Sequence, residues 1–206
     1  MLEAADLECE RGGKTLFRRL SFSLPGGELL RVAGANGSGK TSLLRILCGL
    51  LSPTQGEVRW QGSAIQRLRE EYSKQLLYLG HAPAVKDDLT AAENLSISCA
   101  LAGMHAGEEA IREALARFGL AGKDQPVKRL SQGQRRRAAL ARLCLAESAP
   151  LWLLDEPFSA LDTAGVDVLR TLIHAQLARG AAVAYTTHQD PGIAAARLID
   201  LDQQAA

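Results

Sequence analysis

Residues 29–41 read Leu-Leu-Arg-Val-Ala-Gly-Ala-Asn-Gly-Ser-Gly-Lys-Thr, and the part from Gly34 to Thr41 fits the phosphate-loop pattern G-x-x-x-x-G-K-S/T. The apolar run Leu29–Ala33 predicts a buried strand before this loop, and Thr41–Leu51 predicts a helix after it. A chance match in a chain of this length has a probability of roughly 1%, so a glycine-rich turn without function is the weaker interpretation. The stretch predicts a nucleotide-binding loop between a strand and a helix.

The residue types in this loop explain how it would hold phosphate. Glycines let the backbone curl so that several N–H groups face one phosphate cluster, and the following helix adds the positive end of its dipole. Lys40 would reach the β and γ phosphates as a point charge, and Thr41 would offer its hydroxyl to Mg²⁺. The residues expected to bind the nucleotide, ATP, are Gly34, Asn36, Gly37, Ser38, Gly39, Lys40, Thr41 and Ser42.

A second apolar run, Leu151–Leu154, ends in Asp155-Glu156. Two carboxylates at the end of a parallel strand lie at the sheet edge where α/β proteins bind ligands. We expect Asp155 to hold Mg²⁺ through water and Glu156 to accept the proton of the attacking water. A strand that ends in solvated acids is the alternative, but the phosphate loop in the same chain favours the catalytic interpretation.

The remaining pattern predicts one α/β domain over residues 1–206, with a parallel sheet and two additions. Further parallel strands are expected at Gln75–Leu79, Ala181–Thr186 and Leu198–Leu201. Leu16–Leu24 and Glu57–Gln61 suggest a small antiparallel sheet. Ala91–Ala102 and Glu108–Phe118 suggest helices of an α-helical insert that covers approximately residues 82–135. The fold class is therefore a P-loop NTPase core with a small antiparallel β subdomain and a helical insert.

Composition narrows the possible partners. Lys and Arg number 24 against 23 Asp and Glu, so the formal net charge is +1 and no basic excess indicates nucleic acid. No apolar stretch is long enough to span a membrane, and the N-terminus does not resemble a secretory signal. The cysteines are scattered without a C-x-x-C pair, which favours reduced core thiols over a metal or redox site; they are Cys9, Cys48, Cys99 and Cys144.

A third motif, Leu130-Ser-Gln-Gly-Gln134, has the form of a helix N-terminus with Ser131 as its N-cap. It resembles the LSGGQ signature of the ABC ATPases, with Gln132 in place of the first glycine. Ser159-Ala-Leu-Asp162 resembles the D-loop of that family, and His188 resembles its switch histidine. The resemblance covers essentially the whole chain.

The resemblance implies two copies of the chain packed head to tail, with ATP between the phosphate loop of one copy and the signature helix of the other. The signature residues that would touch the nucleotide across this interface are Ser131, Gln132, Gly133 and Gln134. His188 would contact the γ-phosphate and help position the water, so the expected catalytic residues are Glu156, His188 and His81. Asp162 would sense the opposite site.

Two positions depart from the family pattern. Most members have a glutamine at the position of His81, and we expect this histidine to act through water, because imidazole is a poor ligand for Mg²⁺. A surface loop histidine without a role is the alternative. The aromatic residue that usually stacks on adenine is replaced by Arg11, whose guanidinium plane can also stack on a base. A solvated turn arginine is equally compatible, and the nearby Phe17 has the pattern of a core residue.

The segment 78–95, from Tyr78-Leu-Gly-His81 to Glu93-Asn-Leu95, resembles the ATPase subunits of bacterial cytochrome c maturation, often called haem exporters. That resemblance implies integral membrane partners of the B and C type, a peripheral position on the cytoplasmic face of the inner membrane, and ATP-driven release of a haem-loaded chaperone. Direct haem binding is not expected, because the chain has no C-x-x-C-H. Residues 86–94 would receive the membrane partner, and Thr90 or Asp88 would cap the next helix.

Other functions remain open at the level of sequence. An ABC transporter for another small substrate is the main alternative, since little beyond the His81 segment separates the two. A soluble ABC ATPase acting on DNA or ribosomes usually carries two ATPase units or a long coiled-coil insertion, and neither occurs here. A non-catalytic binding module commonly lacks the base that Glu156 provides.

Overall fold

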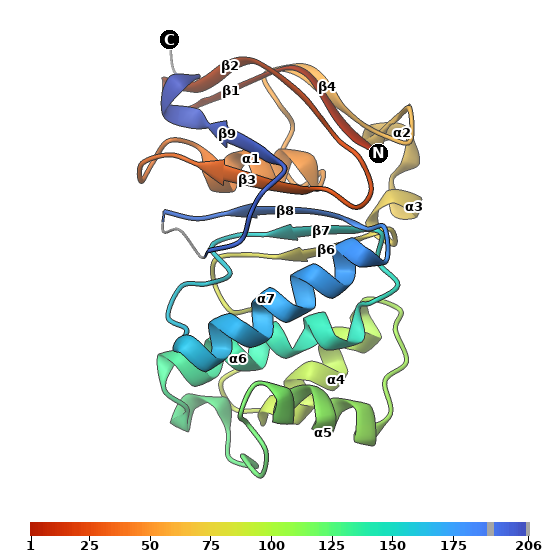
Figure 1. The fold of residues 1–206 in the computed structure, drawn as a ribbon, viewed down its shortest axis with the longest axis vertical. Helices are drawn as coiled ribbons and strands as arrows, with labels where there is room; N and C mark the ends of the chain where they lie inside the picture. Colours follow the sequence, from red (N-terminus) through yellow and green to blue (C-terminus); the bar gives the residue numbers. More distant parts are fainter. Residues whose placement is uncertain (189–191, 205–206) are drawn as a thin grey trace. The chain divides into compact units, whose positions relative to one another are not determined.

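The computed structural model describes residues 1–188 and 192–204, and the chain divides into two compact units (Figure 1). The first unit comprises Met1–His81, Ala149–Pro157 and the C-terminal stretch from Ala175. The second comprises Ala82–Ser148 and Phe158–His174. The helical insert expected at approximately 82–135 thus lies inside a larger unit, which also takes in a segment that follows Glu156.

Among the described residues of the first unit, five parallel strands form a sheet in the order β6-β7-β8-β3-β9. Every residue of β7 and β8 is buried, as expected for apolar strands covered on both faces. The prediction of a parallel sheet is confirmed: the limits of β3 and β7 match the predicted ones, and the ends of β6, β8 and β9 differ by at most one residue. The strands are β3 (Leu29–Ala33), β6 (Leu76–Leu79), β7 (Leu151–Leu154), β8 (Ala182–Thr186) and β9 (Arg197–Asp200).

The same unit holds an antiparallel sheet in the order β2-β1-β4-β5. Its strands are β1 (Leu2–Arg11), β2 (Lys14–Leu24), β4 (Gln55–Trp60) and β5 (Ser63–Ala64). Sequence patterns predicted β2 and β4 but missed β1. The reason is a register shift between Ala4 and Leu7, where Asp6 has a φ of 48°, so that the buried positions of β1 change their period in mid-strand.

Helix α1 (Lys40–Leu47) lies between these two sheets (Figure 1), and its apolar side chains join both to one core. Leu43, Leu44 and Leu47 are fully buried in this core with Phe17 of β2. The helix stops at Leu47, four residues before the predicted end. The N–H of Leu50 donates to the carbonyl of Arg45 and Gly49 has a φ of 78°, the pattern of a glycine-terminated helix.

Two short helices, α2 (Ile65–Leu68) and α3 (Glu70–Ser73), precede β6. After β9, the 3₁₀ helix η3 (Leu201–Gln203) replaces the last residue of the predicted strand Leu198–Leu201, and the N–H of Arg18 in β2 donates to the carbonyl of Gln204 at 3.3 Å. Leu201 is fully buried, so η3 is packed against the core.

The second unit is helical. It contains α4 (Ala91–Leu101), α5 (Glu108–Arg117), η1 (Val127–Arg129), α6 (Gln132–Leu140), η2 (Ala141–Leu145) and the first part of α7 (Thr163–Ala178). The two helices predicted for the insert are confirmed. Thr90 and Glu93 form a capping box at the start of α4, so Thr90 is the cap, while the Asp88 carboxylate pairs with Lys128. Within residues 1–188 and 192–204, no helix has the length and apolar character needed to cross a membrane.

Candidate functional site

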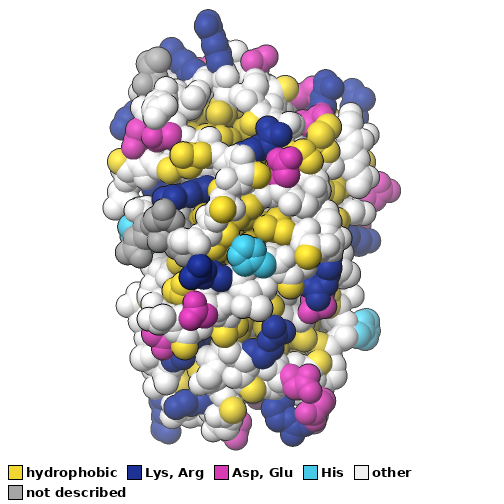
Figure 2. Space-filling view, in the orientation of Figure 1, with side chains coloured by type: hydrophobic (Ala, Val, Ile, Leu, Met, Phe, Trp, Pro, Cys, Tyr) yellow, Lys and Arg dark blue, Asp and Glu magenta, His cyan; other side chains and the backbone are white. Residues whose placement is uncertain are grey.

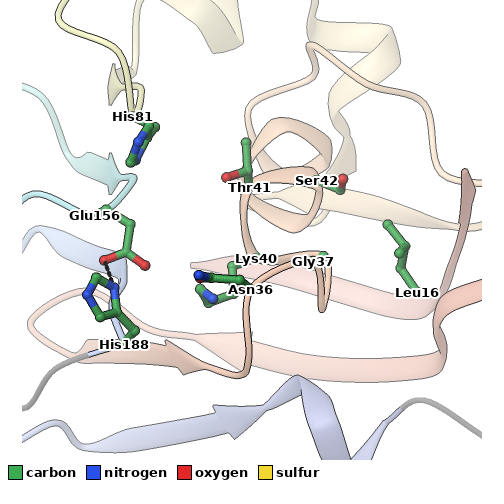
Figure 3. Close-up of a pocket in the computed structure, with 10 residues that line it drawn as sticks. Leu16, Asn36, Gly37, Lys40, Thr41, Ser42, His81, Glu156 and His188 are labelled. Atoms are coloured by element: carbon green, nitrogen blue, oxygen red, sulfur yellow. Dashed lines mark hydrogen bonds and ion pairs between the residues drawn. The ribbon is translucent and has the colours of Figure 1, made fainter.

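A cavity of about 510 Å³ opens beside the phosphate loop, and all its lining residues belong to the first unit (Figure 3). They come from β2, from the β3–α1 loop and its helix, and from the segments that follow β6, β7 and β8. Because β3, β6, β7 and β8 are parallel, their carboxyl ends meet at one sheet edge. The lining residues are Leu16, Asn36, Gly37, Gly39, Lys40, Thr41, Ser42, His81, Glu156 and His188.

The loop itself is shaped by close approaches that exclude side chains. A Cβ on Gly34 would lie 2.5 Å from Oγ of Ser38, and one on Gly39 would lie 3.0 Å from Cβ of Leu16. Both glycines also have positive φ values, 144° and 104°. The backbone therefore curls tightly, with Ser38 turned inward, and only glycine fits at these two positions.

Lys40 lies across this curl. Its ammonium donates to the carbonyls of Gly34 at 2.7 Å and Ala35 at 3.0 Å, and the residue is only 8% exposed. An ammonium has three N–H donors, so a third remains for an anion that enters the loop. The loop thus holds a preset positive charge at the point where the sequence predicted phosphate.

Thr41, the next residue, connects the loop to the end of β7. Its hydroxyl donates to Oδ2 of Asp155 at 2.8 Å, and the hydroxyl of Thr186 donates to Oδ1 of the same carboxylate at 2.7 Å. Asp155 is fully buried. A hydroxyl and a carboxylate side by side at a phosphate loop are the hard oxygen donors that suit Mg²⁺. The residues present therefore fit the metal predicted from the sequence.

Thr186 also organises the second carboxylate, and its role was missed in the sequence. Its Oγ1 accepts the N–H of Glu156 at 2.8 Å while donating to Asp155. Glu156 has a φ of 49°, a conformation that non-glycine residues adopt at a cost and that is concentrated at functional sites. A threonine at the end of β8, beside the strand that carries two acids, was the signal available in the sequence.

Glu156 faces the cavity and pairs with a histidine. The distance from Oε2 of Glu156 to Nδ1 of His188 is 3.0 Å, and Glu156 is 8% exposed (Figure 3). His81 projects into the same cavity from the segment after β6. The structure thus brings together the three residues predicted as catalytic, around a space beside Lys40.

In the second unit, the signature segment begins α6 as predicted. Oγ of Ser131 accepts the N–H of Gln134, and the Gln134 side chain accepts the N–H of Ser131, which confirms Ser131 as the N-cap. Gln132 is exposed as the first helical residue. A Cβ on Gly133 would lie 2.9 Å from the carbonyl oxygen of Ala160. Gln132 therefore replaces the family's glycine at an exposed position that tolerates a side chain. Gly133, where the D-loop comes close, remains glycine.

Asp162 of the D-loop directly precedes α7. Its Oδ1 accepts the N–H of Gly165 at 2.9 Å, and its Oδ2 lies 3.6 Å from Nη1 of Arg137 on α6. The signature helix and the D-loop are thus connected within the second unit.

Arg11 ends β1 and is exposed, opposite Lys14 in the β1–β2 hairpin. It is not among the residues that line the cavity, whereas Leu16 is. Adenine stacking on Arg11 stays a prediction. Phe17 is fully buried, as its strand pattern indicated.

Cys9 and Cys99 lie in the core as predicted, whereas Cys48 and Cys144 are half-buried. All are free, and burial raises the pKa of each of the four thiols. No group of three or more His, Cys, Asp or Glu side chains that could hold a metal ion occurs in the described part of the chain.

Comparison with known proteins agrees with this geometry. The ABC transporter family model matches residues 17–159. The "Cytochrome c biogenesis ATP-binding export protein CcmA" of Aromatoleum aromaticum is 53% identical over 208 residues, covering 100% of this chain and 97% of the relative. The protein of the same name from Nitrosomonas europaea is 53% identical over 191 residues, covering 92% and 89%.

A solved structure extends the comparison to the fold. It is the dimeric post-hydrolysis state of an ATP-binding cassette bound to ADP and Pi, which superposes with a TM-score of 0.77 at 25% identity and covers 92% of this chain and 88% of that one. The predicted fold class is confirmed. The chain therefore belongs to the ATP-binding, ATP-hydrolysing subunits of the ABC transporter family, among the cytochrome c biogenesis ATP-binding export proteins.

Proposed function

We propose that this chain hydrolyses ATP in the cavity beside the phosphate loop and thereby drives a membrane complex of cytochrome c biogenesis. The observation that carries the proposal is the convergence of one buried ammonium, Lys40, and two carboxylates, Asp155 and Glu156, at a single sheet edge. A cation, a hard-metal site and a base are the parts that phosphoryl transfer to water requires.

The hydrolysis follows from these positions. A water attacks the γ-phosphorus of ATP, gives its proton to the Glu156 carboxylate, and the bond from the γ-phosphorus to the bridging oxygen of ADP breaks. Lys40 offsets the charge on the β and γ phosphates. His188 orients Glu156 through the 3.0 Å contact, and His81 orients the water. Mg²⁺ held by Thr41, and by Asp155 through water, would neutralise phosphate charge.

The active form is a dimer of two copies of the chain. The N-terminus of α6 presents the positive end of a helix dipole, which suits the γ-phosphate of a nucleotide bound by the partner. Ser131, Gln132, Gly133 and Gln134 form that terminus. In support, the similar ATP-binding cassette was solved as a dimer with ADP and Pi. Loss of the bridging phosphate charge would loosen the two copies, and Asp162 would sense that change.

The names of the relatives support a proposal for the transport partner. Those named for cytochrome c biogenesis and export are about half identical to this chain over nearly its full length. We therefore place the chain as a peripheral subunit on the cytoplasmic face of the bacterial inner membrane, bound to integral B-type and C-type subunits. It would power release of a haem-loaded chaperone without binding haem itself.

Nucleic acid is not a proposed partner. The formal net charge is +1, and basic and acidic side chains are interspersed on the face drawn in Figure 2. A stripe of one sign, which phosphate backbones require, is not visible on that face.

The deciding experiment is complementation. Bacteria that lack their own ATPase subunit of cytochrome c maturation would receive this chain or its K40A variant, together with the matching membrane subunits. We expect holocytochrome c to return with the wild type and not with K40A, while purified wild type hydrolyses ATP. ATPase activity without rescue would assign the chain to a transporter for another small substrate. Rescue by K40A would refute the ATP-dependent mechanism.

A further inference from the structure

Asp202, which belongs to none of the sequence motifs, contacts the phosphate loop. The N–H of Ala35 donates to both carboxylate oxygens of Asp202, at 3.1 Å and 2.9 Å. Asp202 lies in η3, 167 positions further along the chain. A negative side chain beside a polyphosphate site is unfavourable by simple electrostatics, so its presence there calls for a compensating benefit.

Asp202 stabilises the first turn of the phosphate loop. The carbonyls of Gly34 and Ala35 accept the Lys40 ammonium, and the N–H of Ala35 donates to Asp202. The first turn of the loop is therefore held from both sides, by a cation on its carbonyls and an anion on its amide. Asp202 accepts the Ala35 amide through its side chain, so it can hold this peptide in place whether or not the Lys40 ammonium also contacts phosphate.

Asp202 is itself fixed by the sheet. Ala33 at the end of β3 pairs with Asp200 at the end of β9. The phosphate loop and η3 therefore begin side by side, directly after two paired strands. Oδ1 of Asp200 accepts the N–H of Asp202 at 3.1 Å, and Leu201 is fully buried. The carboxylate is thus preorganised, and a Cβ added at Gly34 would already lie 3.4 Å from it.

We infer that Asp202 is a positioning residue that holds the phosphate loop in its nucleotide-binding conformation without touching the nucleotide. This inference rests on the proposed function, because it assumes that the loop binds ATP. The role requires an acceptor at Asp202 and not its charge. Asparagine keeps one acceptor oxygen and removes the charge, whereas alanine removes both, so the two variants separate these properties.

The test measures binding of the fluorescent analogue MANT-ATP with Mg²⁺, and steady-state ATPase kinetics, on full-length D202A, D202N and wild type. Loss of a charge-assisted hydrogen bond predicts roughly ten-fold weaker binding and a matching rise of KM in D202A, with kcat within about two-fold. D202N should stay within about three-fold of wild type. Q203A is the matched control, because it changes the neighbouring side chain of η3 and leaves both contacts with Ala35 in place.

Amide hydrogen exchange of Ala35, measured by NMR without nucleotide, keeps this test separate from the proposed function. We expect exchange about ten-fold faster in D202A than in wild type or Q203A, whether or not the chain binds ATP. Unchanged Ala35 exchange in D202A would overturn the inference. So would MANT-ATP binding by D202A within two-fold of wild type, or a D202N variant as weak as D202A. Failure of wild type to bind MANT-ATP would instead refute the proposed function.

Discussion

Nδ1 of His188 lies 3.0 Å from Oε2 of Glu156, a base whose own backbone is held in a left-handed conformation. The two residues come from segments that follow neighbouring strands, β7 and β8. The family resemblance implies that His188 contacts the γ-phosphate. The contact between the two side chains therefore links the orientation of Glu156 to the presence of that phosphate. Glu156 and His188 should therefore act as one unit in catalysis.

Replacing Glu156 with Gln should lower ATP turnover about a hundred-fold or more and leave ATP bound, because the amide cannot accept the proton of water. An ATP-bound dimer should then accumulate and be visible by size-exclusion chromatography. H188A should also lower turnover, and the double variant should be no slower than E156Q alone, since both changes disable the same unit. Strictly additive losses would contradict the coupling.

Asp155 provides a test of the metal site that leaves the fold intact. In D155N the amide oxygen still accepts from Thr186, and the amide N–H group can donate to the hydroxyl of Thr41, so thermal stability should change little. Adding Mg²⁺ should strengthen MANT-ATP binding in the wild type about ten-fold more than in D155N, because D155N lacks the carboxylate that would hold the metal. D167N, at an exposed aspartate of α7, serves as the control. Equal stimulation by Mg²⁺ would place the metal elsewhere.

The two signature positions Gln132 and Gly133 should respond oppositely to substitution. G133A puts a Cβ 2.9 Å from the carbonyl oxygen of Ala160 and must displace the D-loop or the helix start. We expect ATP turnover to fall by about ten-fold or more, since small displacements of this kind are costly in catalysis. Q132G, at the exposed first position of α6, should stay within about two-fold. A large loss in Q132G with none in G133A would reverse the assignment.

His81 lines the cavity as a replacement for the glutamine of most family members. If it orients water, H81Q should keep turnover within about three-fold, because glutamine also donates and accepts hydrogen bonds, while H81A should lose roughly ten-fold. The measurement is kcat at saturating Mg-ATP, where a change in nucleotide affinity does not contribute. Full activity of H81A would support the alternative of a loop histidine without a role.

Local patterns predicted the parts of the site that lie within single segments. The spacing from Gly34 to Thr41 marked the phosphate loop, and an apolar strand before Asp155 marked the acids. Parallel strands bring such segments to one edge, so the convergence of these residues was also predictable. Ser131 was identified as a cap because a capping residue acts within one turn of its helix.

What the sequence did not reveal are contacts between side chains that are remote in the chain. The carboxylate of Asp202 reaches the amide of Ala35 only because β9 pairs with β3, and no local pattern encodes that pairing. Thr186 bridges Asp155 and Glu156 because β8 pairs with β7, a pairing that no local pattern encodes either. Leu16 was assigned to a strand, but its place on the cavity wall depends on how β2 packs against the loop.

The segment expected to receive the membrane partner offers a final prediction, because its backbone is fixed independently of its surface charge. Asn94, which is 8% exposed, accepts the N–H of Lys86 at 2.6 Å and donates to its carbonyl at 3.0 Å. The Lys86 side chain is exposed. Charge reversal at Lys86 should therefore alter the docking surface without unfolding the loop.

In K86E, binding to membranes that contain the integral subunits should weaken by roughly ten-fold, as measured by co-sedimentation, because a complementary charge at an interface is inverted. MANT-ATP binding should match wild type. K74E applies the same charge change at an exposed lysine of the first unit and should still co-sediment. Normal co-sedimentation of K86E would remove Lys86 from the docking surface. Loss of MANT-ATP binding in K86E would show that the loop serves the nucleotide site and would count against its assignment to the membrane partner.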